Sequence, residues 1–181
     1  QEDAEHFDRV AVKWSDDGGE TWAEPQPVRV EGLPVGFQRP FDPTLTQLAD
    51  GRIRLYFSCG PRRQGGLDEG VATYSALSAD GIDYAFEPGA RFWTIGRPVI
   101  DCAVARTGDR WHYCAPIGRP EEGAYCATSA NGLSFARLRD LPAETGQNWT
   151  GNLLASGDGL RFYGSSPRGV RWAESKNGVE W

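Results

Sequence analysis

The sequence predicts an all-β fold, a β-propeller of four-stranded antiparallel blades, with about 3.5 blades of a five-bladed ring present in the chain. A turn signal built on serine repeats four times, with its serines 63, 51 and 46 residues apart, and a period of about 50 residues is typical of repeat architectures. Asp-Gly or Gly-Asp turns lie within the repeats, between short β-rich runs. The 23 Gly, 12 Pro and 12% aromatic residues among 181 suit a β protein with many turns.

The repeated signal is a serine followed by Asp or Asn, then Gly and an aromatic residue. We name these four segments the serine turns: 15–22, 78–84, 129–135 and 175–181. The acidic or amide side chain can accept hydrogen bonds from turn amides, and Gly supplies the positive φ that such turns need. We therefore expect turn roles, not catalysis, for Asp17, Asp80, Asn131 and Asn177. The aromatic residues should pack between neighbouring sheets; these are Trp22, Tyr84, Phe135 and Trp181.

The strands follow from the two turn types. Turns in which Asp and Gly are adjacent, at 49–51, 107–109 and 157–159, each join two β-rich runs, which is a strong hairpin signal. A longer loop then leads to a second hairpin that a serine turn closes. This predicts a single, incomplete propeller domain over 1–181, with blades at about 9–29 (half), 41–93, 99–141 and 150–181 (truncated). Because a propeller needs four or more blades to close, either the chain is a piece of a longer protein or copies associate to complete the ring.

Charge and hydropathy exclude several classes of partner. The net charge of −6 and pI near 5.0 argue against nucleic acid, and no apolar run approaches the roughly 20 residues of a membrane helix. The four cysteines form no Cys-x-x-Cys pair, so we expect no metal site and no cofactor. Cys102 and Cys114 are placed to face each other across the hairpin at Gly108, either as buried thiols or as a disulfide. The expected location is bacterial and extracellular or periplasmic, although the cysteines leave the compartment open.

Candidate catalytic residues lie at the start of each innermost strand. Counting back eight residues from Asp50, Asp109 and Asp158 gives Asp42, Asp101 and Thr150. Equivalent strands converge on the axis of a propeller, so the two carboxylates should meet there. Paired carboxylates with pKa values pushed apart are what glycoside hydrolysis requires. The alternative is structural: an Asp before Pro often caps a turn.

Two resemblances to known families accompany this pattern. Residues 15–22 fit Ser-x-Asp-x-Gly-x-Thr-Trp and resemble the Asp box of sialidases. The run from Phe41-Asp42-Pro43-Thr44 to Leu55-Tyr56-Phe57, within a similarity over about 40–165, resembles five-bladed glycoside hydrolases: arabinanases, xylosidases and fructan-cleaving enzymes. The resemblance implies that Asp42 is the general base or nucleophile and that Asp101 orients it and modulates its pKa. It also implies a Glu acid on the third blade, where this chain has Thr150, and an axial calcium or sodium ion in some relatives.

Other residues complete the predicted site. Arg39 and Arg97 are candidate substrate-binding residues or structural ion pairs, and Trp149 is a candidate sugar platform or a core residue. The missing acid could instead come from the loops; the candidates are Asp68, Glu69, Glu121, Glu122 and Glu144. The sequence thus predicts a carbohydrate ligand, which a glycoside hydrolase would cleave at the central pocket. The alternatives are a sialidase that uses arginines around an acidic sugar, and a non-catalytic propeller that binds glycan or protein.

Overall fold

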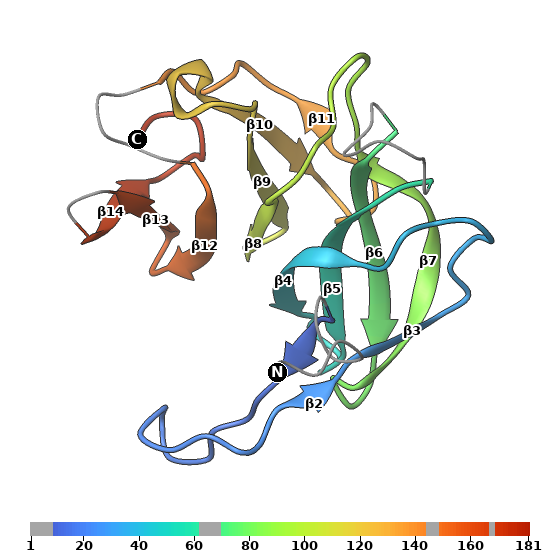
Figure 1. The fold of residues 1–181 in the computed structure, drawn as a ribbon. Helices are drawn as coiled ribbons and strands as arrows, with labels where there is room; N and C mark the ends of the chain where they lie inside the picture. The colour runs from blue at the N-terminus through green and yellow to red at the C-terminus, as the bar shows by residue number, and fades with distance from the viewer. Residues whose placement is uncertain (1–8, 62–69, 144–148, 167–168) are drawn as a thin grey trace.

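The computed structural model describes residues 9–61, 70–143, 149–166 and 169–181. These residues form fourteen strands in four sheets and one 3₁₀ turn, with no α-helix among them. Figure 1 shows the three larger sheets arranged around a common centre, with β4, β8 and β12 innermost. This is the arrangement of a partial propeller.

The first sheet has the order β3-β7-β6-β5-β4. Its antiparallel strands are β4 (Phe41–Gln47), β5 (Ile53–Cys59), β6 (Ala72–Ser78) and β7 (Asp83–Phe92). A fifth strand, β3 (Arg29–Glu31), pairs in parallel with β7 and was not expected from the sequence. Arg29 Nε donates to Asp83 Oδ1 at 2.5 Å, which fixes the register of this added strand.

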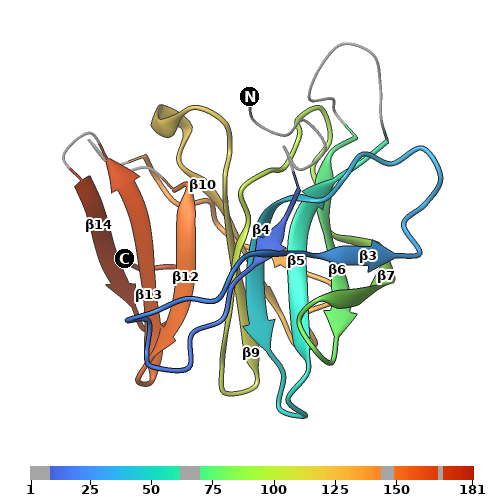
Figure 2. The same cartoon turned by 60° about the horizontal axis from the view of Figure 1, so that its bottom comes forward.

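The second sheet comprises β8 (Ala103–Thr107), β9 (Arg110–Pro116), β10 (Ala124–Ser129) and β11 (Ala136–Arg137), with η1 (Pro120–Glu122) between β9 and β10. The third sheet comprises β12 (Gly151–Ser156), β13 (Gly159–Ser166) and β14 (Gly169–Ser175). Near the N-terminus, β1 (Ala11–Val12) and β2 (Gln26–Pro27) form a separate hairpin. Figure 2 shows the second sheet standing between the first and the third.

Aromatic side chains fill the two spaces between neighbouring sheets. Between the first and second sheets, Tyr56, Phe92 and Tyr113 are buried in one cluster. Between the second and third, Trp149, Leu153 and Phe162 are buried in another. The inner strands also contact one another, since Thr46 Oγ1 donates to Val104 O at 3.3 Å. Packing between the faces of neighbouring sheets therefore fixes the positions in space at which β4, β8 and β12 begin.

The serine turns have the hydrogen bonds predicted for them. In the second turn Ser78 Oγ accepts from Gly81 N at 2.8 Å, and Asp80 Oδ1 accepts from Ile82 N at 2.9 Å. The third and fourth turns repeat this pattern. Tyr84 and Phe135 are buried as expected. The expectation for Trp22 is wrong: its side chain is 58% exposed, because no sheet among the described residues packs over it.

All four cysteines are buried free thiols in the structure. The predicted pairing across the hairpin at Gly108 is off by one residue, since Ala103, not Cys102, lies opposite Cys114. The hairpin turn is centred between Gly108 and Asp109, which moves every partner by one position. No helix in the described part of the chain has the length and apolar character needed to cross a membrane.

Candidate functional site

Asp42 and Asp101 share an unusual backbone conformation. Asp42 is the second residue of β4 and has φ of 50°, and Asp101 lies just before β8 with φ of 54°. They are the only non-glycine residues with positive φ in the described ranges. At Asp42 the pairing of β4 with β5 is interrupted by a bulge between Phe41 and Thr44. Such strain costs about 1–3 kcal/mol per residue and is typical of functional sites.

The two carboxyl groups meet. The side chain of Asp42 lies within hydrogen-bonding reach of the Asp101 carboxyl group. Burial, the charge of Asp42 and this hydrogen bond together raise the pKa of Asp101 from 3.8 to about 6. Asp101 therefore takes up a proton at a higher pH than an ordinary carboxyl group does. The sequence predicts that two carboxylates converge at the centre, and Asp42 and Asp101 do lie close to each other.

A buried polar layer supports the pair. Cys102, next to Asp101, is buried and lies close to Thr73 of the first sheet. Thr73 Oγ1 is in turn 2.7 Å from the hydroxyl of Tyr113 in the second sheet. On the inner strands, Thr44 Oγ1 donates to Asn152 Oδ1 of the third sheet at 3.3 Å. These bonds join all three sheets close to the segments that carry Asp42 and Asp101.

Thr150 occupies the third equivalent position, directly before β12, and is partly exposed. Among the alternative acids, Glu121 is exposed. Arg97 holds the carboxylate of Glu122 and keeps its pKa below the usual value, which does not suit a proton donor. Asp68, Glu69 and Glu144 lie outside the described residues.

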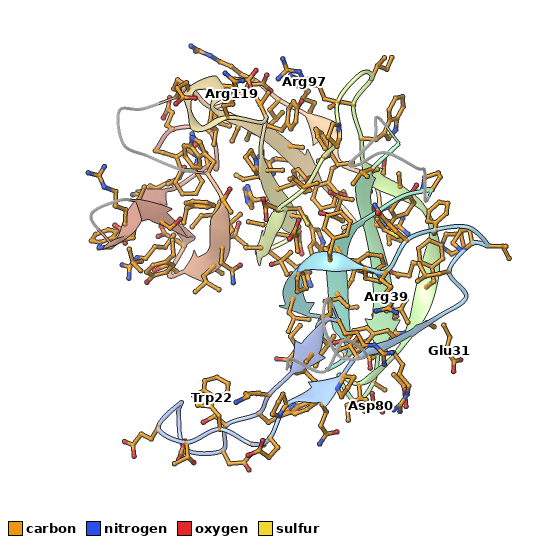
Figure 3. All side chains as sticks on the ribbon, viewed as in Figure 1. Trp22, Glu31, Arg39, Asp80, Arg97 and Arg119 are labelled. Atoms are coloured by element: carbon orange, nitrogen blue, oxygen red, sulfur yellow. The ribbon has the colours of Figure 1, made fainter. Side chains whose placement is uncertain are left out.

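The predicted binding residues lie in different surroundings. Arg39 is exposed and lines a pocket of about 280 Å³ with apolar residues such as Val28 and Phe37, and neither Asp42 nor Asp101 lines it. Arg97 forms an ion pair with Glu122 at 2.6 Å, and Figure 3 shows it at the outer edge of the molecule. The structural alternative for Arg97 thus has a partner, although Glu takes the place of the Asp expected from the sequence.

Trp149 is only 4% exposed. Its ring lies 5.1 Å from that of Phe162 and 5.7 Å from that of Trp181, measured between centroids. Its Nε1 donates to Pro142 O at 3.4 Å. A sugar contact by Trp149 stays a prediction that these core contacts do not favour.

Sequence reasoning did not single out a buried charge network in the first sheet. Arg54 donates to both carboxylate oxygens of Glu87, and Ser75 Oγ donates to Glu87 Oε2 at 2.6 Å. Arg91 donates to Ser75 Oγ and to Leu133 O of the third serine turn. The one sequence signal for this network is the charged residue Arg54 within the largely apolar run that forms β5. No group of three or more His, Cys, Asp or Glu side chains that could hold a metal occurs in the described part of the chain.

Comparisons with known proteins support the fold. No family model matches the chain, and no curated protein matches it. Solved structures do match: a β-xylosidase with TM-score 0.65 and 15% identity, covering 94% of this chain and 64% of its own; and a family 117 glycoside hydrolase of Zobellia galactanivorans with TM-score 0.60 and 12% identity, covering 80% and 54%. An α-L-arabinofuranosidase of Lactobacillus brevis has TM-score 0.56 and 11% identity, covering 87% and 58%.

These matches confirm the all-β propeller fold and the resemblance to propeller glycoside hydrolases. At such identities they show the fold alone. The chain spans between half and two thirds of the length of the structures it matches.

Proposed function

We propose that this chain is part of a glycoside hydrolase in which Asp42 is the general base or nucleophile and Asp101 holds and tunes it. The observation that supports the proposal is the hydrogen-bonded Asp42–Asp101 pair, with both residues at positive φ on neighbouring inner segments. When two neighbouring carboxyl groups differ in pKa, the one with the lower pKa can act as the base while the other holds the proton.

The chemistry follows from the shared proton. Asp101 retains a proton up to about pH 6 and directs it to Asp42, which fixes the orientation of the Asp42 carboxylate. An ionised Asp42 then either takes a proton from water, whose oxygen bonds to the anomeric carbon, or bonds to that carbon itself, in which case water afterwards breaks the bond between Asp42 and the sugar and frees the carboxylate. In both routes the glycosidic C–O bond breaks and the leaving oxygen needs a proton. Among the candidate acids that the structure describes, Glu121 remains available for this protonation. The further candidates are Asp68, Glu69 and Glu144.

The substrate is a glycan, and pentose-containing glycans are the first to test. The similar structures carry the names β-xylosidase and α-L-arabinofuranosidase. The proposed steps use only side chains of the protein, so the sugar would bind to the site without a cofactor.

The variant Asp42→Asn tests the proposal sharply, because Asn tolerates positive φ as well as Asp does, so the variant removes the carboxylate without straining the backbone. We expect hydrolysis of 4-nitrophenyl β-xyloside, 4-nitrophenyl α-arabinofuranoside and arabinoxylan to fall at least about a hundredfold. Asp109→Asn is the matched control, since the Asp109 side chain is fully exposed. Released sugar is the readout, with thermal unfolding to verify folding. Hydrolysis by Asp42→Asn at the parent rate would refute the assignment.

A non-catalytic propeller that binds glycan is the second candidate, and Thr150 at the third position favours it. In that case the parent protein would bind arabinoxylan without releasing sugar, and Asp42→Asn would have no turnover to lose. A catalytic protein would keep its binding and lose its turnover in the same variant.

A further inference from the structure

We infer that a groove on the second sheet, away from the Asp pair, binds a neutral segment of a glycan chain. Its walls are the connection between β7 and β8, which carries Trp93 and Arg97, and the second-sheet residues Glu122 and Arg137. Its volume is about 770 Å³. Figure 3 shows Arg97 and Arg119 along this edge of the molecule, far from Trp22. The choice of a carbohydrate ligand rests on the proposed function.

Trp93 provides the apolar platform. Its side chain is 61% exposed, whereas the preceding Phe92 is buried between the sheets. After Trp93 the backbone closes a narrow turn, in which Thr94 pairs with Arg97 and Thr94 Oγ1 donates to Arg97 O at 3.2 Å. The indole of Trp93 thus points outward between the buried Phe92 and Thr94, which is held by its contacts with Arg97. The C–H face of a sugar ring is apolar, and an exposed indole offers a rigid surface of matching size.

Two planar ion pairs provide the polar contacts. Arg97 Nη1 lies 2.6 Å from Glu122 Oε1, and Glu122 Oε2 accepts from Arg119 N at 3.0 Å. Arg137 Nε donates to Asp140 Oδ1 at 2.9 Å, and its guanidinium lies 4.7 Å from the ring centre of Tyr125. Each guanidinium has five N–H donors, so donors remain for a ligand at side chains that are about half exposed. Sugar hydroxyl groups suit such fixed donors and acceptors.

The charges of the groove favour a neutral ligand. Arg97 and Arg137 are balanced by Glu122 and Asp140, the other charged residues in its lining. An acidic sugar would therefore meet carboxylates as well as guanidinium groups. The centre of a protein–protein interface is depleted of charged residues, whereas four of the nine residues that line this groove are charged. A neutral glycan fits these features better than a protein does.

The groove lies near the Asp pair along the chain. Arg97 precedes Asp101 by four residues, so their Cα atoms are at most roughly 14 Å apart. The inference places the sugar at Trp93 and the sugar at the carboxylates on one glycan chain, so it concerns a polymer rather than a disaccharide.

The test measures binding, not hydrolysis. Native gel electrophoresis through arabinoxylan, linear arabinan, agarose and mannan detects retention of the protein by neutral chains. We expect retention of the parent by at least one of them and, for Trp93→Ala, a loss of affinity of roughly tenfold. Trp22→Ala is the matched control, since Trp22 is 58% exposed and outside the groove, and it should be retained like the parent. Thermal unfolding verifies that both variants are folded.

The outcomes separate this inference from the proposed function. If Trp93→Ala binds as well as the parent, or if no polysaccharide retains the parent, the groove is not a glycan site, even where aryl glycosides are hydrolysed. If retention depends on Trp93 but no glycoside is hydrolysed, the groove is supported and the catalytic proposal fails.

Discussion

In the proposed function, Asp42 and Asp101 serve both an unusual backbone conformation and the chemistry. Positive φ is costly for most L-residues, but the short polar side chains of Asp and Asn tolerate it better than others. The same conformation occurs at two equivalent places, with φ of 50° and 54°, and it is absent at Thr150, the third equivalent position in the described residues. Both carboxyl groups are thereby turned toward each other instead of alternating with the strand.

We predict that Asp101→Asn is more stable than the parent at pH 7 and that this advantage shrinks toward pH 4. The folded-state pKa of Asp101 is raised to about 6, so the folded protein holds a proton that the unfolded chain releases near pH 4. The parent therefore loses stability as pH rises from about 4 through 6, and Asn, which does not titrate, removes that loss. Because Asp101 is only half buried, we expect a difference on the order of 1 kcal/mol at pH 7.

Thermal unfolding of both proteins between pH 4 and pH 7 measures this difference. A difference in melting temperature that is constant across this range would contradict the raised pKa.

At the scale of elements, the serine turns connect sheets as well as strands. Gly132 O in the third serine turn accepts the hydroxyl of Tyr56 at 2.9 Å, and Asn131 O accepts from Arg54 at 3.2 Å. The fourth turn is held in the same way, since Cys126 Sγ donates to Gly178 O at 3.1 Å. The third and fourth serine turns thus each contact the preceding sheet.

We predict that Gly132→Ala destabilises the protein by about 3 kcal/mol. A methyl group at this position would lie 2.6 Å from the Tyr56 hydroxyl and 2.9 Å from Trp111, both of which are buried, and φ of 72° adds backbone strain. Gly51→Ala is the control, because its φ is 86° but nothing lies within 4 Å, so about 1 kcal/mol is expected from strain alone. Urea unfolding compares the two; equal losses would show that the contact with Tyr56 is unimportant.

The sheets could largely be predicted from the sequence because their signals are local. Turn chemistry and β-rich runs lie within a few residues of each other, and counting back from the turns places Asp42 and Asp101 together. In contrast, β3 has three residues and a partner strand about fifty residues away, which no local pattern reveals. Arg97 forms its ion pair with Glu122, and Trp149 packs against Trp181. Because both partners are distant in the sequence, neither the pairing of Arg97 nor the burial of Trp149 could be inferred from the sequence.

At the scale of the whole molecule, the third sheet has two unlike faces. Leu153, Leu160 and Phe162 pack against the second sheet. The opposite face exposes apolar side chains among polar ones: Leu154 is 49% exposed, Val170 78% and Trp172 60%. A blade within a propeller is covered on both faces, so this face has the character of one that a further sheet would cover.

We predict that the 181 residues expressed alone self-associate at micromolar concentrations through this face. Sedimentation velocity should give an average mass above 19.9 kDa that rises with concentration. Val170→Lys, which places a charge on the exposed face, should return the chain to a monomer, and Val35→Lys, at an exposed residue outside this face, should not. A parent that stays monomeric at all concentrations would contradict the prediction.

The positive φ of Asp42 and Asp101 also has an evolutionary consequence. The residues that this conformation tolerates best are Asp, Asn and Gly, and a single base change turns an Asp codon into a codon for either of the others. Under the proposed function, catalysis at this centre would therefore be lost or regained in one mutational step while the backbone stays as it is. Descendants of such a gene could move between cleaving a glycan and only holding it, without any change of fold.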